Sequence, residues 1–487
     1  MKNFIYASSD DSFSTTSGTA TSRLTLNIPG QPANPQTWLV IVSWQLYANS
    51  VLGDAQVNAE YTDSSGTQIM GGHRQIPNDS DEYDSGGCFR VFQDLSGDLD
   101  IVLKVRSVNG TQVTLQNARV LAIRIPEDYL GPYKVSNNTT TSYLGGGGKR
   151  EVLASISDHV PEGRYLALAC ADVDLPAATG VITSCMKVIQ SIPQDGASAI
   201  EMVEAIPDEF DASVPSRLTR SHDASNGRRH TFFHMWVTHL KEGEVSVVLE
   251  LQSNEGSPPA TAQFQSGSVL LLRLDGFHEF YDARVPGKWE SNTGTLTPII
   301  SNGVGRRITG QTRNVVRLGY AVMGHVDTTS NVGAQVVIRD MENPSNTLVQ
   351  SRIESLGYGA ETREIVLASM TNTDGPLELT SAEVGSSSNS AVLSSGVLLS
   401  FIDEQSQRSG VPISVPIGYD WDLSGAHECD RIDLETLEKL KTVAKAGLPL
   451  SALETVEVVH ESLDRVRLAV TDRLFSKSGS SNWQSLG

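Results

Sequence analysis

Three short apolar runs of similar composition recur along this chain, and they constrain its fold more than any other feature. They lie at residues 119–125, 268–274 and 396–402, are rich in Val, Leu and Ile, and each closes a segment full of turn residues. A continuous apolar run bounded by turn signals is typical of a strand covered on both faces. The sequence therefore predicts three copies of one β-rich unit, each ending in such a closing strand.

Other strands of the three units align in the same order. A second long apolar strand is expected at residues 38–47, 164–173 and 317–326, and an alternating strand at 99–105, 245–251 and 377–379. The separation from the start of the alternating strand to the first Val of the closing strand is similar in each unit: Leu99 to Val120 is 21 residues, Val245 to Val269 is 24, and Leu377 to Val397 is 20. Unit two is longer before this point, and we place an insertion of about twenty residues between Pro193 and Ser221.

Units of this size, with six to eight short strands, have the dimensions of a β-sandwich. We predict a mainly β protein of three tandem antiparallel β-sandwich (jelly-roll-like) domains at residues 1–126, 151–276 and 298–403, arranged as beads on a string. The Gly-rich segment 127–150 and the segment 277–297 are interpreted as linkers. Residues 404–430 are expected to form a connector, followed by a small C-terminal helical pair at 431–476.

The second helix of this pair carries a heptad-like apolar seam. Its members, the candidate oligomerisation residues, are Val456, Val459, Leu463, Val466 and Val470. Such a seam either packs within an αα-hairpin of the same chain or self-associates in a helix bundle.

The charge balance excludes two classes of partner as the main function. Lys and Arg total 37 against 57 Asp and Glu, a formal net charge of −20. Such an acidic chain repels phosphate backbones and anionic membranes, so neither nucleic acid nor membrane is expected as a partner. The sequence has no apolar run of about 18 residues, so no membrane-spanning helix is expected, and the residues after Met1 lack the apolar stretch expected of a signal peptide. Its cysteines lack metal-binding spacing and are expected to be reduced thiols.

Two clusters of side chains are candidate metal ligands. Asp79, Asp81 and Asp84 alternate on a polar loop expected between Gly71 and Gly87, and carboxylates in this pattern hold Ca²⁺. A solvated acidic loop is the favoured interpretation, with Ca²⁺ the one cofactor considered and no other expected. His230 and His234 have the i, i+4 spacing of a helical zinc site, but their segment reads as a strand, which separates the rings by about 13 Å. They are interpreted as residues on the surface or on a sheet face.

No catalytic residue is assigned, and the protein is not expected to be an enzyme. No nucleophile elbow, Walker or dinucleotide-binding sequence follows a strand. A hydrolase carried on one sandwich stays a minor alternative. Several aromatic side chains are candidates for stacking against a sugar: Trp44, Tyr83, Trp236, Trp289 and Trp483. Trp44 and Trp236 lie within expected strands and are assigned to the core.

The closing strand in its setting, residues 116–126 with a copy at 267–277, resembles β-sandwich modules of tailed-bacteriophage virion structural proteins. The resemblance covers residues 1–405, and unit three departs from it, with Phe401 in place of the Arg of the other two. It implies a non-enzymatic virion component on the head, neck or tail, such as a capsid decoration or a tail fibre. It carries over no functional residue.

The resemblance also implies partners and a location. The chain is expected to be made in the host cytoplasm and built into the virion, where it contacts itself as a homo-oligomer and other virion proteins. The alternative is a carbohydrate-binding adhesin or receptor-binding protein, whose partner is a host-surface glycan.

Overall fold

The computed structural model describes most of residues 4–403. The described ranges are 4–48, 54–75, 82–125, 130–144, 150–175, 180–193, 200–206, 218–222, 228–255, 262–274, 280–284, 289–291, 297–304, 313–325, 334–340, 347–353, 362–373, 378–386 and 391–403. They belong to one compact unit, Met1–Gln405. The expected connector and helical pair, with the five candidate oligomerisation residues, lie outside the described residues. Within the described part, no helix has the length and apolarity to cross a membrane.

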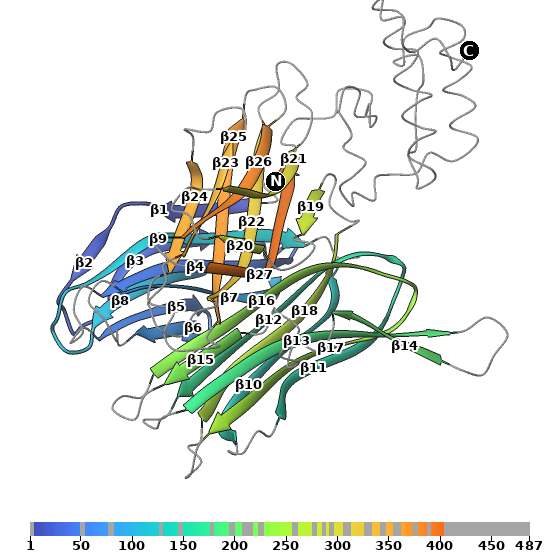
Figure 1. The fold of residues 1–487 in the computed structure, drawn as a ribbon, viewed down its shortest axis with the longest axis horizontal. Helices are drawn as coiled ribbons and strands as arrows, with labels where there is room; N and C mark the ends of the chain where they lie inside the picture. The colour runs from blue at the N-terminus through green and yellow to red at the C-terminus, as the bar shows by residue number, and fades with distance from the viewer. Residues whose placement is uncertain are drawn as a thin grey trace, which may run out of the picture. The chain divides into compact units, whose positions relative to one another are not determined.

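Module one is a sandwich of two antiparallel sheets (Figure 1). Its first sheet has the order β1-β9-β4-β7, formed by β1 (Phe4–Ser9), β9 (Val113–Ile125), β4 (Gln36–Ala48) and β7 (Glu82–Leu95). Its second has the order β3-β8-β5-β6, formed by β3 (Thr21–Ile28), β8 (Leu99–Ser107), β5 (Ala55–Asp63) and β6 (Gly66–Gln75). The short strand β2 (Phe13–Thr15) pairs with β9.

Module two repeats this plan. One sheet is β10-β18-β12-β16, formed by β10 (Leu130–Leu144), β18 (Ala262–Arg273), β12 (Gly163–Leu175) and β16 (Arg228–Leu240). The other is β11-β17-β13-β15, formed by β11 (Arg150–Val160), β17 (Gly243–Glu255), β13 (Gly180–Pro193) and β15 (Leu218–His222). The predicted insertion between Pro193 and Ser221 contains an extra strand, β14 (Ile200–Ile206), which folds back antiparallel on β13.

Module three repeats the plan again. One sheet is β19-β27-β22-β25, formed by β19 (Phe280–Arg284), β27 (Ala391–Asp403), β22 (Arg313–His325) and β25 (Thr362–Thr373). The other is β21-β26-β23-β24, formed by β21 (Thr297–Val304), β26 (Glu378–Ser386), β23 (Ala334–Asp340) and β24 (Thr347–Ile353). The short strand β20 (Trp289–Ser291) also pairs with β27.

The strand order is the same in all three modules. With β2, β14 and β20 set aside, the eight strands of each module follow the order 1-8-3-6 in one sheet and 2-7-4-5 in the other. This is the order of a jelly roll, in which two Greek keys make two facing antiparallel sheets. The fold class predicted for residues 1–403, three antiparallel β-sandwiches of jelly-roll type, is confirmed.

Two segments that were predicted to be linkers contain strands that pair with closing strands. In segment 127–150, β10 pairs with the closing strand β18, from Leu130 opposite Leu272 to Leu144 opposite Ala262. In segment 277–297, β19 pairs with the closing strand β27. Each is the first strand of the module that follows it. The glycines of residues 145–148 lie outside the described residues.

The long apolar strands are covered on both faces, as predicted, and the two faces belong to different cores. In β4, Val40 and Val42 point into the sandwich of module one, together with Trp38 and Trp44. Leu39 points the other way, into a larger core that also contains residues of modules two and three. Full burial of such an aliphatic side chain stabilises the fold by roughly 1.5–3 kcal/mol.

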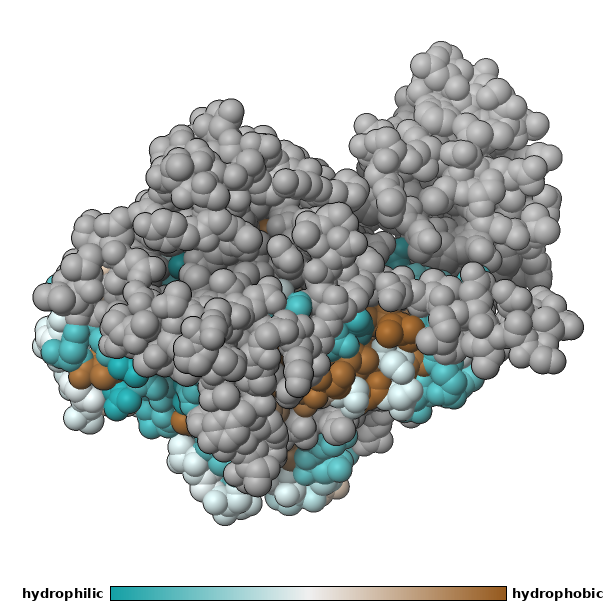
Figure 2. Space-filling model, turned by 60° about the horizontal axis from the view of Figure 1, so that its bottom comes forward, coloured by the Kyte–Doolittle hydropathy of each residue, from teal (hydrophilic) through white to brown (hydrophobic). Residues whose placement is uncertain are grey.

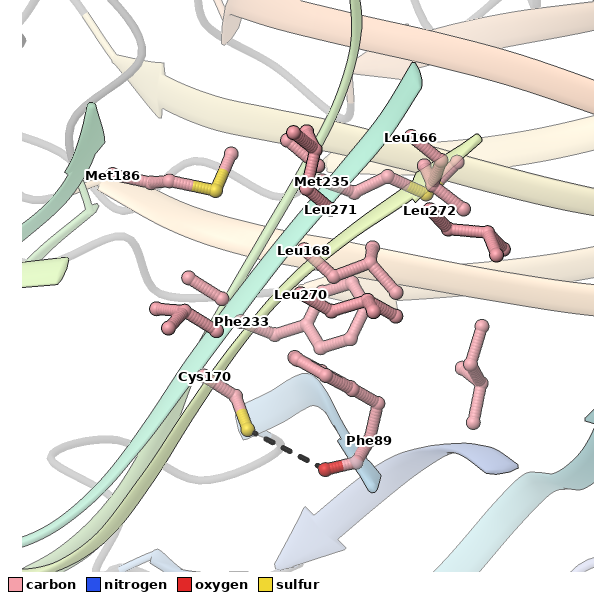
Figure 3. Packing of buried hydrophobic residues seen from close by; sticks show 14 of the residues in the cluster. Phe89, Leu166, Leu168, Cys170, Met186, Phe233, Met235, Leu270, Leu271 and Leu272 are labelled. Carbon is pink, nitrogen blue, oxygen red and sulfur yellow. Dashed lines mark hydrogen bonds between the residues drawn. The ribbon is translucent and has the colours of Figure 1, made fainter. Parts of the chain in front are cut away.

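That larger core, which we call the shared core, joins the three modules. Phe89 of module one, Phe233 of module two and Tyr320 of module three all belong to it. Figure 3 shows Phe89 and Phe233 among leucines and methionines of module two, and the Cys170 Sγ donates to the Phe89 carbonyl at 3.6 Å. The expected beads on a string are therefore wrong. The second face of each closing-strand sheet is buried against other modules, which explains why the closing strands contain consecutive apolar residues.

The modules are also joined through the backbone of one sheet. Thr219 of β15, an edge strand of module two, pairs with Thr362 of β25, an edge strand of module three, so two four-strand paths become one larger sheet. The described cysteines Cys88, Cys170 and Cys185 are buried with no disulfide among them, and Cys429 lies outside the described residues.

Few large apolar side chains of the described surface remain exposed. They are Ile69, Val108 and Val152, which lie in β6, after β8 and in β11. On the face seen in Figure 2, described hydrophilic side chains surround smaller patches of apolar ones. Most of the apolar surface of these sheets is therefore used inside the unit.

Candidate functional site: a polar seam between the modules

A chain of buried charged side chains lies where the three modules meet. We call it the seam, and it consists of His73 and Asp84 of module one, His230 of module two, and Arg363 and Glu364 of module three. None of the five is more than 6% exposed. Charged side chains are almost never fully buried unless they are paired, so this cluster is the strongest candidate for a special role in the described part.

The two histidines connect the carboxylates across the module boundaries. The Nδ1 atoms of His73 and His230 are 2.8 Å apart, and the rings meet edge to face with centroids 4.9 Å apart. On the far side of His230, Nε2 lies 3.0 Å from Glu364 Oε1, within hydrogen-bond distance. The interaction therefore runs from module one through module two to module three.

The module-one end of the seam is held by ion pairs. His73 Nε2 lies 2.9 Å from Asp84 Oδ2, although the angles are not those of a hydrogen bond. Arg363 Nη1 lies 3.7 Å from Asp84 Oδ1. Asp84 thus lies between a guanidinium of module three and an imidazole of its own module.

A second polar contact joins modules one and two beside the seam. Gly72 N donates to Thr231 Oγ1 at 2.8 Å, and the same hydroxyl donates to the Gly72 carbonyl at 2.8 Å. Arg229 Nε donates to both carboxylate oxygens of the neighbouring Asp172, at 2.9 and 3.1 Å. Burial raises the pKa of Asp172, and the contact with Arg229 opposes the rise.

Glycines allow this close approach. A Cβ on Gly71 would lie 2.7 Å from the Cys88 Cβ and 3.0 Å from Thr231 Oγ1, and one on Gly72 would lie 2.8 Å from the Val57 carbonyl oxygen. Atoms this close to a Cβ would have to move. Gly71 therefore leaves room for β16 of module two, and Gly72 leaves room for β5 of its own module.

His234 is buried in module two and has a different environment from His230. Its Nε2 is 2.8 Å from the Ser184 Oγ of β13. Burial lowers the pKa of His234 to about 4, and the charge of Glu364 only partly opposes this shift. The ring is therefore neutral at neutral pH.

The structure places the predicted metal candidates as follows. Asp79 and Asp81 lie outside the described residues. Asp84 was expected on a solvated loop, but β6 and β7 occupy much of that segment. Asp84 lies on β7, where it is buried and contacts His73. His230 and His234 lie on one strand, β16, as expected, but both are buried and have separate partners. Among the described residues, no group of three or more His, Cys, Asp and Glu side chains is placed to hold a metal ion.

The aromatic candidates also separate. Trp44 is buried in module one, as expected, and Trp236 packs partly buried against the shared core. Tyr83 is half-buried and stacks on Tyr47, with ring centroids 4.3 Å apart. Nothing is described for the side chain of Trp289, and Trp483 lies outside the described residues.

Most of the seam was not singled out from the sequence. Glu364 begins an expected apolar strand segment, residues 364–367. An ionisable residue in such a strand requires a partner, and that local conflict was the available signal. The identity of the partner was not available, because His73, His230 and Glu364 are far apart in sequence.

Comparisons with known proteins give the following. Neither a family model nor a curated relative matches the chain. Solved structures with a similar arrangement include PNGase F, a glycosylasparaginase from Flavobacterium meningosepticum (11% identity, 56% of this chain and 96% of that chain, TM-score 0.26). A second is the tandem CBM22 domains of Xyn10C from Paenibacillus barcinonensis (10% identity, 55% of this chain and 93% of that chain, TM-score 0.17). A third is a triple-jelly-roll protein of an archaeal virus turret (10% identity, 78% of this chain and 82% of that chain, TM-score 0.16).

These likenesses carry no argument about function at such identities and TM-scores. The chain is a triple-jelly-roll protein on the evidence of its own strand order. Its polar seam is buried and its members contact one another across the module boundaries, so the role it supports is recognition between modules.

Proposed function

We propose that this chain is a non-enzymatic structural component of a tailed-phage virion, an exposed multi-domain β-sandwich protein that assembles through protein–protein contacts. The observation that supports this most is the shared core. Three jelly rolls of one strand order bury their closing-strand sheets against each other, and the charged groups at their junction contact one another. Such a unit is a rigid block with a fixed geometry, which a particle assembled from many copies requires.

The acidic surface supports the same proposal. A net charge of −20 keeps a large β protein soluble before assembly and directs it away from packaged nucleic acid. We assign the self-association to the C-terminal residues Val456 to Val470 and the contacts with other virion proteins to the loops and edges of the modules.

Two measurements test the proposal. In a lysate that contains the complete phage, antibody labelling and electron microscopy of gradient-purified particles locate the chain, and its recovery only in the soluble fraction would refute the virion role. Deletion of residues 428–487, which lie outside the compact unit Met1–Gln405, tests the assembly. We expect a lower mass by light scattering and lost incorporation, and an unchanged oligomer that is still incorporated would contradict it.

A further inference from the structure

A small pocket opens between modules one and three, and it is lined by uncharged side chains. Its volume is about 140 Å³. Module one supplies Gln45, Tyr83, Gln116 and Asn117, and module three supplies Gln335, Gln350 and Ser351. On a chain with net charge −20, a polar pocket without a carboxylate in its lining differs from the average surface.

The floor of the pocket is a fixed network of amides. Gln45 is 3% exposed, and its Nε2 donates to Gln116 Oε1 at 2.9 Å. Its Oε1 accepts from Asn117 Nδ2 at 3.1 Å and lies 3.4 Å from the Ser351 Oγ of module three. Ser351 also contacts Ser85 of module one at 3.0 Å, beside the seam residue Asp84. The floor is therefore rigid before any ligand arrives.

The mouth of the pocket offers hydrogen-bonding groups and an aromatic ring. Gln335 Nε2 donates to Oε1 of the exposed Gln350 at 2.9 Å. An amide has two N–H groups and two lone pairs, so this contact leaves the Gln335 oxygen and the Gln350 nitrogen with spare capacity. Tyr83 is held by its stack on Tyr47, with an interplanar angle of 26°.

The backbone at Asn117 has an unusual conformation. Its φ is 47°, in the left-handed region, and the register of β4 and β9 shifts between Ser43 and Gln45 at this point. A bulge of this kind re-aims a side chain and is over-represented next to functional sites. Here it is the bulged residue whose amide reaches Gln45.

We propose that this pocket binds one neutral sugar residue, the terminal unit of a glycan. Sugar hydroxyls both donate and accept, which matches the amides of Asn117, Gln335 and Gln350, and the C–H face of a pyranose packs on an aromatic ring such as Tyr83. Drug-sized ligands occupy about 300–1,000 Å³, so a 140 Å³ pocket takes a single residue. An anionic sugar finds no Arg or Lys in the lining, and a cation finds no carboxylate.

The site is independent of the virion role, because a structural protein and an adhesin can both carry it. Ligand-observed NMR with the full chain and D-glucose, D-galactose or N-acetyl-D-glucosamine tests it. We expect saturable binding of at least one of these with a dissociation constant on the order of 1 mM, as ordinary ligand efficiency gives for a hexose. D-glucuronate is expected to bind at least about tenfold more weakly, because its charge is unpaired.

A matched pair of variants assigns the binding to this pocket. Asn117→Gly removes the amide and keeps the positive φ, so the strand still folds, and we expect affinity to fall about tenfold or more. Asp94→Gly makes the same kind of change at φ 51°, on an exposed residue outside the pocket, and should leave affinity unchanged. Gln350→Ala at the mouth should weaken binding without affecting the floor.

Several results would overturn the proposal. One is no saturable binding of any neutral sugar by the wild-type chain. Another is equal affinity for glucuronate, and a third is wild-type affinity in Asn117→Gly. Binding of a blocked neutral trialanine peptide in place of the sugars would also overturn it, since the amides would then recognise peptide groups.

Discussion

Truncation of Phe233 to alanine tests the shared core directly. Phe233 is fully buried in module two, and its ring centroid lies 6.1 Å from that of Phe89 in module one and 6.0 Å from that of Tyr320 in module three. A buried Phe→Ala change costs about 3–5 kcal/mol, including the cavity that it leaves. Two aromatic contacts are lost, each worth about 0.5–1.5 kcal/mol beyond area burial, so we expect the upper end, near 5 kcal/mol.

The assay is hydrogen exchange measured by mass spectrometry, with peptides resolved by module, alongside denaturant unfolding. If the core is shared, β7 and β22 should lose protection together with β16, although the substitution is in module two alone. Val152→Ala, at a side chain that is 58% exposed, is the control and should change stability by less than about 0.5 kcal/mol. Loss of protection confined to module two, with wild-type exchange in β7 and β22, would refute the shared core.

Three further predictions follow from buried groups. Burial lowers the pKa of His234 to about 4 from an unfolded value near 6.5. As the pH falls, the unfolded chain therefore binds this proton before the folded chain does, and the free energy of unfolding should fall by up to about 3 kcal/mol between pH 6.5 and pH 4. His234→Gln should flatten that part of a curve of stability against pH, and an unchanged slope would contradict the prediction. Gly72→Ala should destabilise by about 1–3 kcal/mol in urea titrations because of the Val57 carbonyl, whereas Gly97→Ala, with nothing within 4 Å of its Cβ, should be near neutral, and equal effects would contradict the close packing of β6. Burial raises the pKa of Cys170 to about 11, so alkylation mapped by mass spectrometry should spare Cys170, Cys88 and Cys185 until the chain unfolds, and rapid labelling of the native protein would contradict their burial.

The repetition of similar strands along the chain was predictable because it depends on local pattern. In β4 and in residues 120–123 of β9, consecutive apolar residues occupy both faces, and the sequence separations from the alternating strand to the closing strand agree among modules. The insertion before β15 could be placed for the same reason. A period of two and a bounded apolar run are readable from neighbouring residues alone.

The end of β6 and the start of β7 lie within the loop that was predicted between Gly71 and Gly87, and their glycines explain the error. Gly71, Gly72, Gly86 and Gly87 are turn residues by local preference, but here they create room. A Cβ on Gly87 would lie 2.9 Å from the Val42 carbonyl oxygen and 3.1 Å from Val366 of module three. Space for a neighbouring module depends on residues hundreds of positions away, so a local pattern does not encode it.

The packing of the modules was encoded but misread. A jelly roll that faces water on one side of its closing-strand sheet needs alternating polar residues there, yet 119–125, 268–274 and 396–402 each contain a run of three or four consecutive apolar residues. A closing-strand sheet that is buried on both faces packs one face inside its own sandwich, so its other face needs a neighbouring module to cover it. Beads on a string would have exposed Leu39, Ile41 and Leu121, which are fully buried in the structure.

The seam explains why this packing has a single arrangement. Apolar faces tolerate sliding, since one aliphatic contact replaces another at little cost. Glu364 is 0% exposed, and loss of its contact with His230 breaks a buried pair, which costs about 3–5 kcal/mol. Any shift of module three relative to modules one and two breaks this contact and the one between Arg363 and Asp84 together. The shared core therefore supplies the free energy of association between modules, and the seam selects the register in which they associate.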